Sequence, residues 1–272
     1  MKGPVWHRKQ DREAGRWREE WDGAREEIDR LSRRRFLRLG AAAAGGLAAA
    51  SAGGWLALPA AGADDAVKTG QFIFPRLQFA VYDESPDRWN CGPIGDTILR
   101  KKLAELTNIN VSHEQKVVRL ADFEDMARHP FVFMTSEGYF RLDPAEEKNL
   151  REFLERGGFI LADDCVLYAR EDRFFQTYVK LINKLFPDNP MRKIPYDHEV
   201  FHVYFDFKDG APHMQGVPHG AYGAFERGTG RLMTIATPGD IHCGWQCRFW
   251  GMDKNIQAIK MGINIIIFFL SH

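Results

Sequence analysis

The chain has 272 residues, in which 37 basic and 37 acidic side chains balance and 44% of the residues are hydrophobic. This balance excludes the net positive charge on which nucleic-acid binding depends, and no basic stripe or alternation of basic and aromatic residues is present. The length allows one α/β domain with a well-buried core behind an N-terminal segment of different composition.

The first 63 residues have the organisation of a targeting segment. Residues 1–31 are rich in Arg and Glu and nearly lack aliphatic side chains, which predicts a solvated, partly helical lead. Arg33 and Arg34 follow, then an uncharged Ala/Gly-rich stretch over residues 39–58 and a small-residue end at residues 61–63. This order is typical of a signal peptide, and the arginine pair closely resembles the twin-arginine consensus.

The twin-arginine resemblance implies a bacterial or archaeal protein that folds in the cytoplasm, where a cofactor can be loaded, before the twin-arginine export machinery moves it to the periplasm or out of the cell. The alternative is a membrane anchor, because residues 39–58 are just long enough to span a bilayer. Their low Leu and Ile content makes a poor span, so no stable span is expected after cleavage. Residues 1–63 hold 12 Lys/Arg and 8 Asp/Glu, which leaves the domain over residues 64–272 mildly acidic, with 25 against 29.

Within residues 64–272, helix-like and strand-like patterns alternate. Apolar spacing predicts helices near residues 96–106, 122–128, 144–156, 173–185 and 253–270, and strands near 72–82, 117–120, 130–135, 159–162 and 231–236. Such alternation is typical of a mostly parallel sheet covered by helices on both faces. The aromatic stretch 199–207 is expected to form an antiparallel excursion, and the Gly- and Pro-rich stretch 210–230 a long loop.

The clearest predicted unit is a helix followed by a buried strand in the middle of the chain. Asp143 is placed to cap the first free amides of the helix, and Gly157 suits its left-handed end. Residues 159–162 then form an apolar run, as expected for a strand buried on both faces. The run ends in Asp163 and Asp164, which predicts polar groups at the carboxyl edge of the sheet, where open parallel sheets bind ligands.

Several segments together resemble one family. The segments PFVFMTSEGYF, LDPAEEKNLREFLERGGFILADDC, IPYDHEVF, GRLMTIATPGDI and MGINIIIFF are similar to the domain-of-unknown-function family numbered 4159, almost from end to end of the domain. More broadly, the chain resembles the class I glutamine-amidotransferase-like superfamily. That resemblance implies a flavodoxin-like, three-layer α/β sandwich with a mostly parallel sheet. It does not imply amidotransferase activity, because the position of that superfamily's nucleophilic Cys holds Asp163 and Asp164 here, and no Gly follows Cys165.

Carboxylates recur where the predicted strands end. They are Asp83, Glu84, Glu137, Asp163, Asp164 and Asp240. Because the carboxyl ends of parallel strands meet at one edge, several of these groups are expected to converge, where they raise one another's pKa or are neutralised by a cation. The alternative is that they cap helices and terminate strands. We favour a functional role for Asp163 and Asp164, and the structural role for Asp83 and Glu84.

Residues 198–202 read H-E-x-x-H, the pattern in which zinc proteases bring two His to one metal while the Glu activates water. In those enzymes the motif lies on a helix. Here the adjoining sequence VFHVYFDF favours a strand, on which residues four apart lie about 13 Å from each other, too far for one zinc ion. The protease hypothesis is therefore disfavoured, and His198 alone is kept as a candidate site residue.

A second group of metal-binding residue types is HCGWQC at residues 242–247. Its spacing matches neither a C-x-x-C redox motif nor a haem attachment sequence. His242 and Cys243 suit a soft metal, for which a third ligand has to come from elsewhere. Because an exported domain permits disulfides, the alternative is a bridge from Cys243 to one of the other cysteines, and the sequence leaves the pairing open among Cys91, Cys165 and Cys247.

Two hypotheses for function follow. In the first, the domain is a binding or accessory module that holds a small polar ligand, such as a saccharide or a cation, through Asp163, Asp164, His198 and Asp240. In the second, it is a hydrolase in which Asp163 or His198 is the general base and a divalent metal, with ligands among Asp163, His198, Asp240 and His242, polarises the substrate. We favour the first. A third role, as a structural partner of envelope proteins, requires an exposed apolar patch, whereas the aromatic pairs of this sequence are expected in the core.

Overall fold

The computed structural model describes residues 70–81, 88–166, 172–215, 218 and 220–272, which belong to one compact unit, Gly70–His272. The targeting segment expected over residues 1–63 and the carboxylates Asp83 and Glu84 lie outside the described residues. In the described part of the chain, no helix combines the length and the apolar character that crossing a membrane requires.

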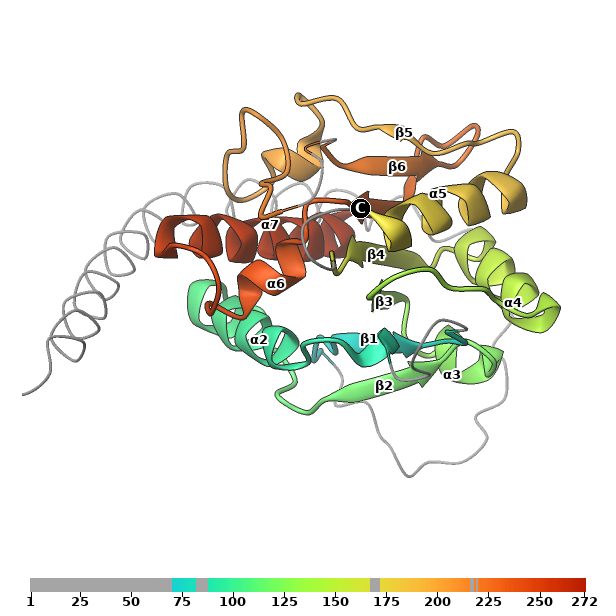
Figure 1. The fold of residues 1–272 in the computed structure, drawn as a ribbon, viewed down its shortest axis with the longest axis horizontal. Helices are drawn as coiled ribbons and strands as arrows, with labels where there is room; N and C mark the ends of the chain where they lie inside the picture. Colours follow the sequence, from blue (N-terminus) through green and yellow to red (C-terminus); the bar gives the residue numbers. More distant parts are fainter. Residues whose placement is uncertain (1–69, 82–87, 167–171, 216–217, 219) are drawn as a thin grey trace, which may run out of the picture. The chain divides into compact units, whose positions relative to one another are not determined.

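A seven-stranded sheet lies at the centre of this unit (Figure 1). Its strands are β1 (Pro75–Gln78), β2 (Lys116–Arg119), β3 (Phe131–Ser136), β4 (Phe159–Asp164), β5 (Arg192–Lys193), β6 (Tyr222–Phe225) and β7 (Leu232–Thr237). They are ordered β2-β1-β3-β4-β7-β6-β5; the first five are parallel, whereas the β7–β6 and β6–β5 pairs are antiparallel. The predicted α/β class with a mostly parallel sheet is therefore confirmed.

The helices divide between the two faces of the sheet (Figure 1). On one face α2 (Ile94–Leu106), α6 (Ile241–Trp245) and α7 (Met252–Ser271) contact one another. The other face is covered by α3 (Phe123–Ala127), α4 (Pro144–Glu155) and α5 (Arg173–Leu185), over a core that includes Leu77, Leu150, Ile160 and Phe174. Two short 3-10 turns, η1 (Arg88–Asn90) and η3 (Glu199–Phe201), lie in the connections.

The unit from α4 to β4 forms as the sequence predicts. The Asp143 carboxylate accepts the backbone N–H groups of Ala145 and Glu146, each at 2.8 Å, and the Glu146 side chain accepts the N–H of Asp143 at 3.2 Å. Gly157, with φ of +98°, ends the helix in the left-handed conformation that glycine adopts without strain. Every residue of β4 is buried, so the strand carries its two terminal carboxylates into the interior.

The stretch 199–207 is not the antiparallel strand that its composition predicts. It begins as η3 and continues without regular structure, because its backbone bonds to α7 instead of to a neighbouring strand. The Asn264 side chain accepts the N–H of Phe205 at 2.8 Å and donates to the carbonyls of Phe205 and Val200 at 2.8 and 3.2 Å. The antiparallel pairing falls on β5 and β6, and β6 lies within the predicted loop 210–230.

The face covered by α2, α6 and α7 is closely packed. Trp245 of α6 is fully buried, and its indole N–H donates to the Ala258 carbonyl of α7 at 2.9 Å. Gly262 lies so close to both neighbouring helices that an added Cβ would be 2.9 Å from Leu99 and 3.1 Å from Trp245. A larger residue at position 262 would force these helices apart, so this packing fixes where α6 stands over the sheet.

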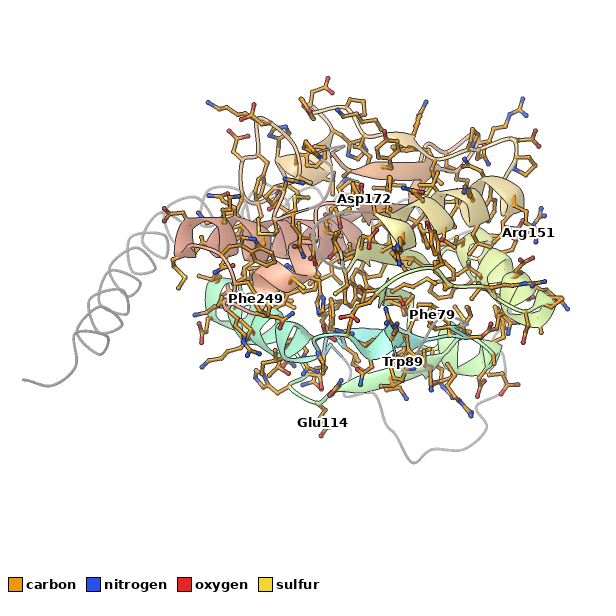
Figure 2. The ribbon with its side chains drawn as sticks, viewed as in Figure 1. Phe79, Trp89, Glu114, Arg151, Asp172 and Phe249 are labelled. Atoms are coloured by element: carbon orange, nitrogen blue, oxygen red, sulfur yellow. The ribbon has the colours of Figure 1, made fainter. Side chains whose placement is uncertain are left out.

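Figure 2 shows how side chains distribute over this scaffold. Phe79 and Trp89 lie inside the domain, whereas Arg151 projects from the outer side of α4 and Phe249 from the segment between α6 and α7. Six of the buried polar side chains lie at or just after the carboxyl ends of the parallel strands: Thr135, Ser136, Asp163, Asp164, Thr237 and Asp240.

Candidate functional site

Asp163 lies at the carboxyl end of β4 on the face covered by α6. Its carboxylate accepts the backbone N–H groups of Ile241 and His242 at 3.2 and 2.9 Å and the Thr237 hydroxyl at 2.5 Å. Burial raises the pKa of Asp163 to about 7, although these hydrogen bonds oppose the shift. Both carboxylate oxygens accept N–H groups from the first two residues of α6, so Asp163 anchors the start of this helix to the end of β4.

Asp164 points to the opposite face of the sheet, because successive side chains of a strand alternate. Its Oδ2 accepts the N–H of Phe175 in the first turn of α5 at 2.8 Å, and its Oδ1 is buried without a hydrogen-bond partner among the described residues. Burial, together with the charges of Asp163 and Asp172, raises the pKa of Asp164 to about 8. The two adjacent carboxylates therefore do not form one cluster.

The turn between β7 and α6 is shaped by Asp240. This residue is in the left-handed conformation, with φ of 56° and ψ of 46°, which Asp tolerates better than most side chains. Its Oδ1 accepts the N–H of Cys243 at 3.4 Å, and its Oδ2 accepts the side-chain amide of Gln215. Asp240 thus caps the short helix and turns it back over the end of β4.

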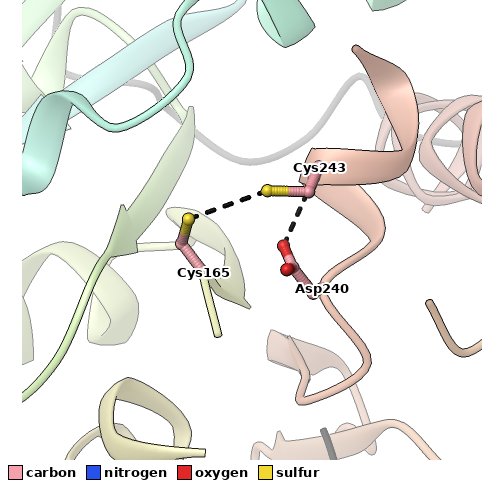
Figure 3. Close-up of side chains that lie close together, drawn as sticks. All are labelled: Cys165, Asp240 and Cys243. Atoms are coloured by element: carbon pink, nitrogen blue, oxygen red, sulfur yellow. Dashed lines mark hydrogen bonds between the residues drawn. The ribbon is translucent and has the colours of Figure 1, made fainter. Parts of the chain in front are cut away.

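Two thiols and a carboxylate meet where α6 passes over β4 (Figure 3). The ligand atoms of Cys165, Asp240 and Cys243 all lie within 4.8 Å of one another, and the two sulfur atoms are 3.7 Å apart. Cys165 and Cys243 are 6% and 7% exposed, and Asp240 is fully buried. All four cysteines of the chain are free thiols. The fold therefore gives Cys243 two partners, Cys165 and Asp240, in place of the pair of His242 and Cys243 that the sequence suggested.

Hydrogen bonds distribute charge unequally over the thiols. A hydrogen bond from the Cys165 thiol, and a further one involving His242, lower the pKa of Cys243 to about 4. The neighbouring sulfur atoms of Cys243 and Cys91, together with burial, raise the pKa of Cys165 well above the ordinary value. Burial and the neighbouring Cys243 likewise raise the pKa of Asp240. These effects favour ionisation of Cys243 over that of Cys165 and Asp240.

His242 stands between the thiols and a buried ion pair. Its Nε2 is 3.0 Å from Nη2 of Arg76 and 3.4 Å from Oδ1 of Asp96. Burial would lower the pKa of His242, but the neighbouring Asp96 carboxylate and Cys243 outweigh it and raise the pKa to about 10. His242 is fully buried with its Nε2 directed at Arg76 and Asp96, so it is not among the three residues whose ligand atoms converge.

The ion pair of Arg76 and Asp96 was not found by the sequence reasoning. Arg76 projects from β1 and binds Asp96 of α2 through two hydrogen bonds of 2.8 and 2.6 Å; the two side chains are 0% and 2% exposed. Arg76 also donates to the carbonyls of Cys91 and Trp89 at 2.6 and 3.2 Å. The only signal in the sequence is a charged residue inside an apolar strand. Asp96, expected to open its helix, instead lies in the first turn of α2.

His198 lies away from this group. It is the N-cap of η3, where its Nδ1 accepts the N–H of Val200 at 3.2 Å, and its ring contacts Phe225 and Phe268. Phe225 pairs with Leu232, the first residue of β7, so this position is at the amino end of the parallel strands. The structure thus does not bring His198 together with Asp163, Asp240 or the thiols.

The H-E-x-x-H motif does not assemble a metal site in the described structure. It lies on a 3-10 turn, and its polar side chains have separate partners: Glu199 pairs with His272 at 3.1 Å, and His202 with Asp206 at 2.5 Å. Glu137, the remaining predicted strand-end carboxylate, lies 3.9 Å from the Cys165 sulfur and 4.0 Å from Arg88, at the margin of the thiol group.

Comparison with known proteins places most of this unit in a single family. Residues 76–270 match the family model described as "Domain of unknown function (DUF4159)". The match begins at Arg76, includes Cys165, Asp240 and Cys243, and ends within α7. No curated protein matches the chain.

Proposed function

The chain belongs to the DUF4159 family, a domain of unknown function, and on that premise we propose that it is a binding module for one soft divalent cation, with Zn²⁺ as the main case. Cys165, Asp240 and Cys243 are the proposed ligands. Thiolate and carboxylate together suit Zn²⁺ better than a hard cation, for which oxygen ligands alone are usual.

The distance between the two sulfur atoms carries the proposal. In a tetrahedral site with Zn–S bonds of about 2.3 Å, two thiolate ligands are separated by about 3.8 Å. Cys165 and Cys243 are 3.7 Å apart, and the carboxylate of Asp240 lies within 4.8 Å of both sulfur atoms. A cation at this place would also neutralise the negative charge of Cys243 in the buried group.

Three protein ligands leave one position of a tetrahedral zinc site open. A small polar ligand could complete the coordination through an oxygen or nitrogen atom. The cation and the small polar ligand, which the sequence suggested as alternatives, would then bind at the same site. The hydrolase hypothesis gains no support, because Asp163 is fully hydrogen-bonded and His198 lies at the other end of the sheet.

Metal titration of the reduced, chelator-treated protein tests the proposal. We expect one Zn²⁺ per chain, and we expect Cys243→Ser and Asp240→Asn each to weaken binding by more than about 100-fold, since even indirect supports of a metal site cost about 10- to 100-fold. Asn keeps the cap and tolerates the left-handed conformation of Asp240, so Asp240→Asn removes the carboxylate and its hydrogen bond from Gln215 while the turn before α6 is retained.

Cys247→Ser is the matched control for this titration. Cys247 lies just after the same short helix but is not one of the proposed ligands. Its replacement therefore makes the same chemical change, Cys to Ser, outside the proposed site. Binding by this variant should equal that of the wild type. Stoichiometry near zero in the wild type, or an equal loss in the Cys247 variant, would reject the cation site.

We also propose that the domain has the flavodoxin-like arrangement implied by its resemblance to the class I glutamine-amidotransferase-like superfamily. The strand order β2-β1-β3-β4-β7, with all neighbours parallel, supports this inference, and so does the division of the helices between both faces. In such sheets ligands bind outside the carboxyl ends of the strands. The proposed ligands Cys165 and Asp240 follow the carboxyl ends of β4 and β7.

We further propose that the domain is exported by the twin-arginine pathway to the periplasm or the cell exterior, on the support of residues 1–63 alone. Replacing both Arg33 and Arg34 by Lys should stop accumulation of the processed form outside the cytoplasm, because Lys does not reproduce the paired guanidinium groups. Fractionation and immunoblotting measure the processed form. Arg12→Lys with Arg16→Lys is the control, and processed double-Lys protein outside the cytoplasm would contradict the assignment.

A further inference from the structure

We propose that Cys165 and Cys243 are a reversible redox pair, which hydrogen peroxide or a similar small peroxide converts to a disulfide when no cation is bound. The inference rests on the proposed function, because the same two sulfur atoms are proposed cation ligands. It adds that the site can be closed by a Cys165–Cys243 disulfide, and that a bound cation prevents this.

The positions of the two thiols support this pairing over the others. Their sulfur atoms are in contact at 3.7 Å, and a disulfide needs a separation of about 2.05 Å. Closure therefore requires an approach of roughly 1.7 Å, shared by two side chains on different elements. Cys165 directly follows β4, and Cys243 lies in α6, so the bond would join the end of the central strand to the helix above it.

The other two cysteines are less suited to this bond. Cys91 is half-buried, contacts the Thr135 hydroxyl at 3.7 Å and lies near enough to Cys165 to lower its own pKa, which makes it the competitor for Cys165 among the described cysteines. Cys247 lies after α6 and is not a member of the thiol group. A disulfide from Cys165 to Cys91 is therefore the specific alternative that an experiment has to separate.

The reaction balances with peroxide as the oxidant. The first thiol and hydrogen peroxide give a sulfenic acid and one water; the second thiol then displaces the sulfenic hydroxyl, which forms the S–S bond and releases a second water. The two thiols lose two electrons, and their two hydrogen atoms leave in water. An external dithiol restores both thiols by exchange. The contact at 3.7 Å favours the second step over further oxidation of the sulfenic acid.

Cation binding and disulfide formation exclude each other, since the bond removes two of three ligands. A bound Zn²⁺ should hold the sulfur atoms as ligands and protect them, whereas the disulfide should abolish Zn²⁺ binding until it is reduced. In an oxidising compartment the site would thus remain reduced only while it is occupied.

Thiol counting and peptide mapping test the proposal on the purified, reduced and chelator-treated chain. Exposure to hydrogen peroxide should lower the alkylated thiols from four to two, and mass spectrometry of the digest should show a peptide that links Cys165 to Cys243. Dithiothreitol should restore four thiols. Cys247→Ser and Cys91→Ser should still form this link, whereas Cys165→Ser should not.

The outcomes separate this proposal from the cation proposal. Retention of all four thiols, or a link from Cys165 to Cys91 in the wild type, overturns the redox pair while leaving Zn²⁺ titration to decide the cation site. Formation of the Cys165–Cys243 link supports the redox pair; if prior Zn²⁺ then fails to slow it by at least about tenfold, the cation site is overturned and the redox pair stands.

Discussion

Arg76→Met should lower the free energy of unfolding by about 3–5 kcal/mol, because it removes the guanidinium that pairs with the buried carboxylate of Asp96. Arg76 and Asp96 are 0% and 2% exposed and share two hydrogen bonds. Burial opposes ionisation of Asp96, but Arg76 beside it holds the pKa of Asp96 below the ordinary value. The carbonyls of Trp89 and Cys91 would also lose their donor.

Chemical denaturation followed by circular dichroism measures this effect. Arg151→Met is the matched control, since Arg151 makes an exposed pair with Glu155 on the outer side of α4, and its loss should change stability by no more than about 1 kcal/mol. Adding Asp96→Asn to Arg76→Met should recover part of the loss by removing the unpaired charge. An Arg76 variant as stable as the Arg151 control would show that the buried pair contributes little.

Asp164→Asn should make the pH dependence of stability between pH 4 and pH 8 shallower. Burial raises the pKa of Asp164 from 3.8 to about 8 in the folded domain, so the folded state holds a proton that the unfolded chain releases. This contribution is fully present below about pH 4 and is lost as the pH rises toward 8, at about 1.4 kcal/mol per pH unit. Over that range the expected loss is on the order of 5 kcal/mol.

The measurement is the free energy of unfolding at several pH values, with a chelator present so that no cation contributes. In Asp164→Asn the Asn oxygen can still accept the N–H of Phe175, and the slope should become shallower by about 1.4 kcal/mol per pH unit. The exposed Asp188→Asn should keep the wild-type slope. Equal slopes in Asp164→Asn and the wild type would mean that Asp164 ionises in the folded domain as easily as in the unfolded chain.

Local signals in the sequence were enough to predict much of the fold. α5 occupies residues 173–185, as its apolar spacing predicts, and α4 begins after Asp143 and ends before Gly157 because capping and left-handed closure are decided by a few neighbouring residues. The strand prediction for residues 199–207 was wrong because aromatic side chains can be buried equally well from a strand and from an irregular segment. The Asn264 side chain, distant in the sequence, decides between them.

The candidate site was predictable only in its location. Asp163, Asp164 and Asp240 lie at the carboxyl ends of β4 and β7, as the run of apolar residues before each predicted. The sequence analysis ended the strand at residue 162, whereas β4 continues through Asp164. Because side chains alternate along a strand, Asp163 and Asp164 point to opposite faces of the sheet. The meeting of Cys165 with Cys243 depends on β7 lying beside β4, and strand order is set by contacts between distant segments.

The place of β7 in the sheet also has a consequence for synthesis of the chain. β7 is the last strand to be made, yet it lies between β4 and β6. A ribosome that adds about 5–20 residues per second needs several seconds to reach it after β4 has emerged. During that interval the nascent chain carries β4 with one unpaired edge, whose first four residues are apolar, and unpaired strand edges recruit other strands. Chains that stop before residue 232 should therefore aggregate, and holding chaperones should act on this protein late in its translation.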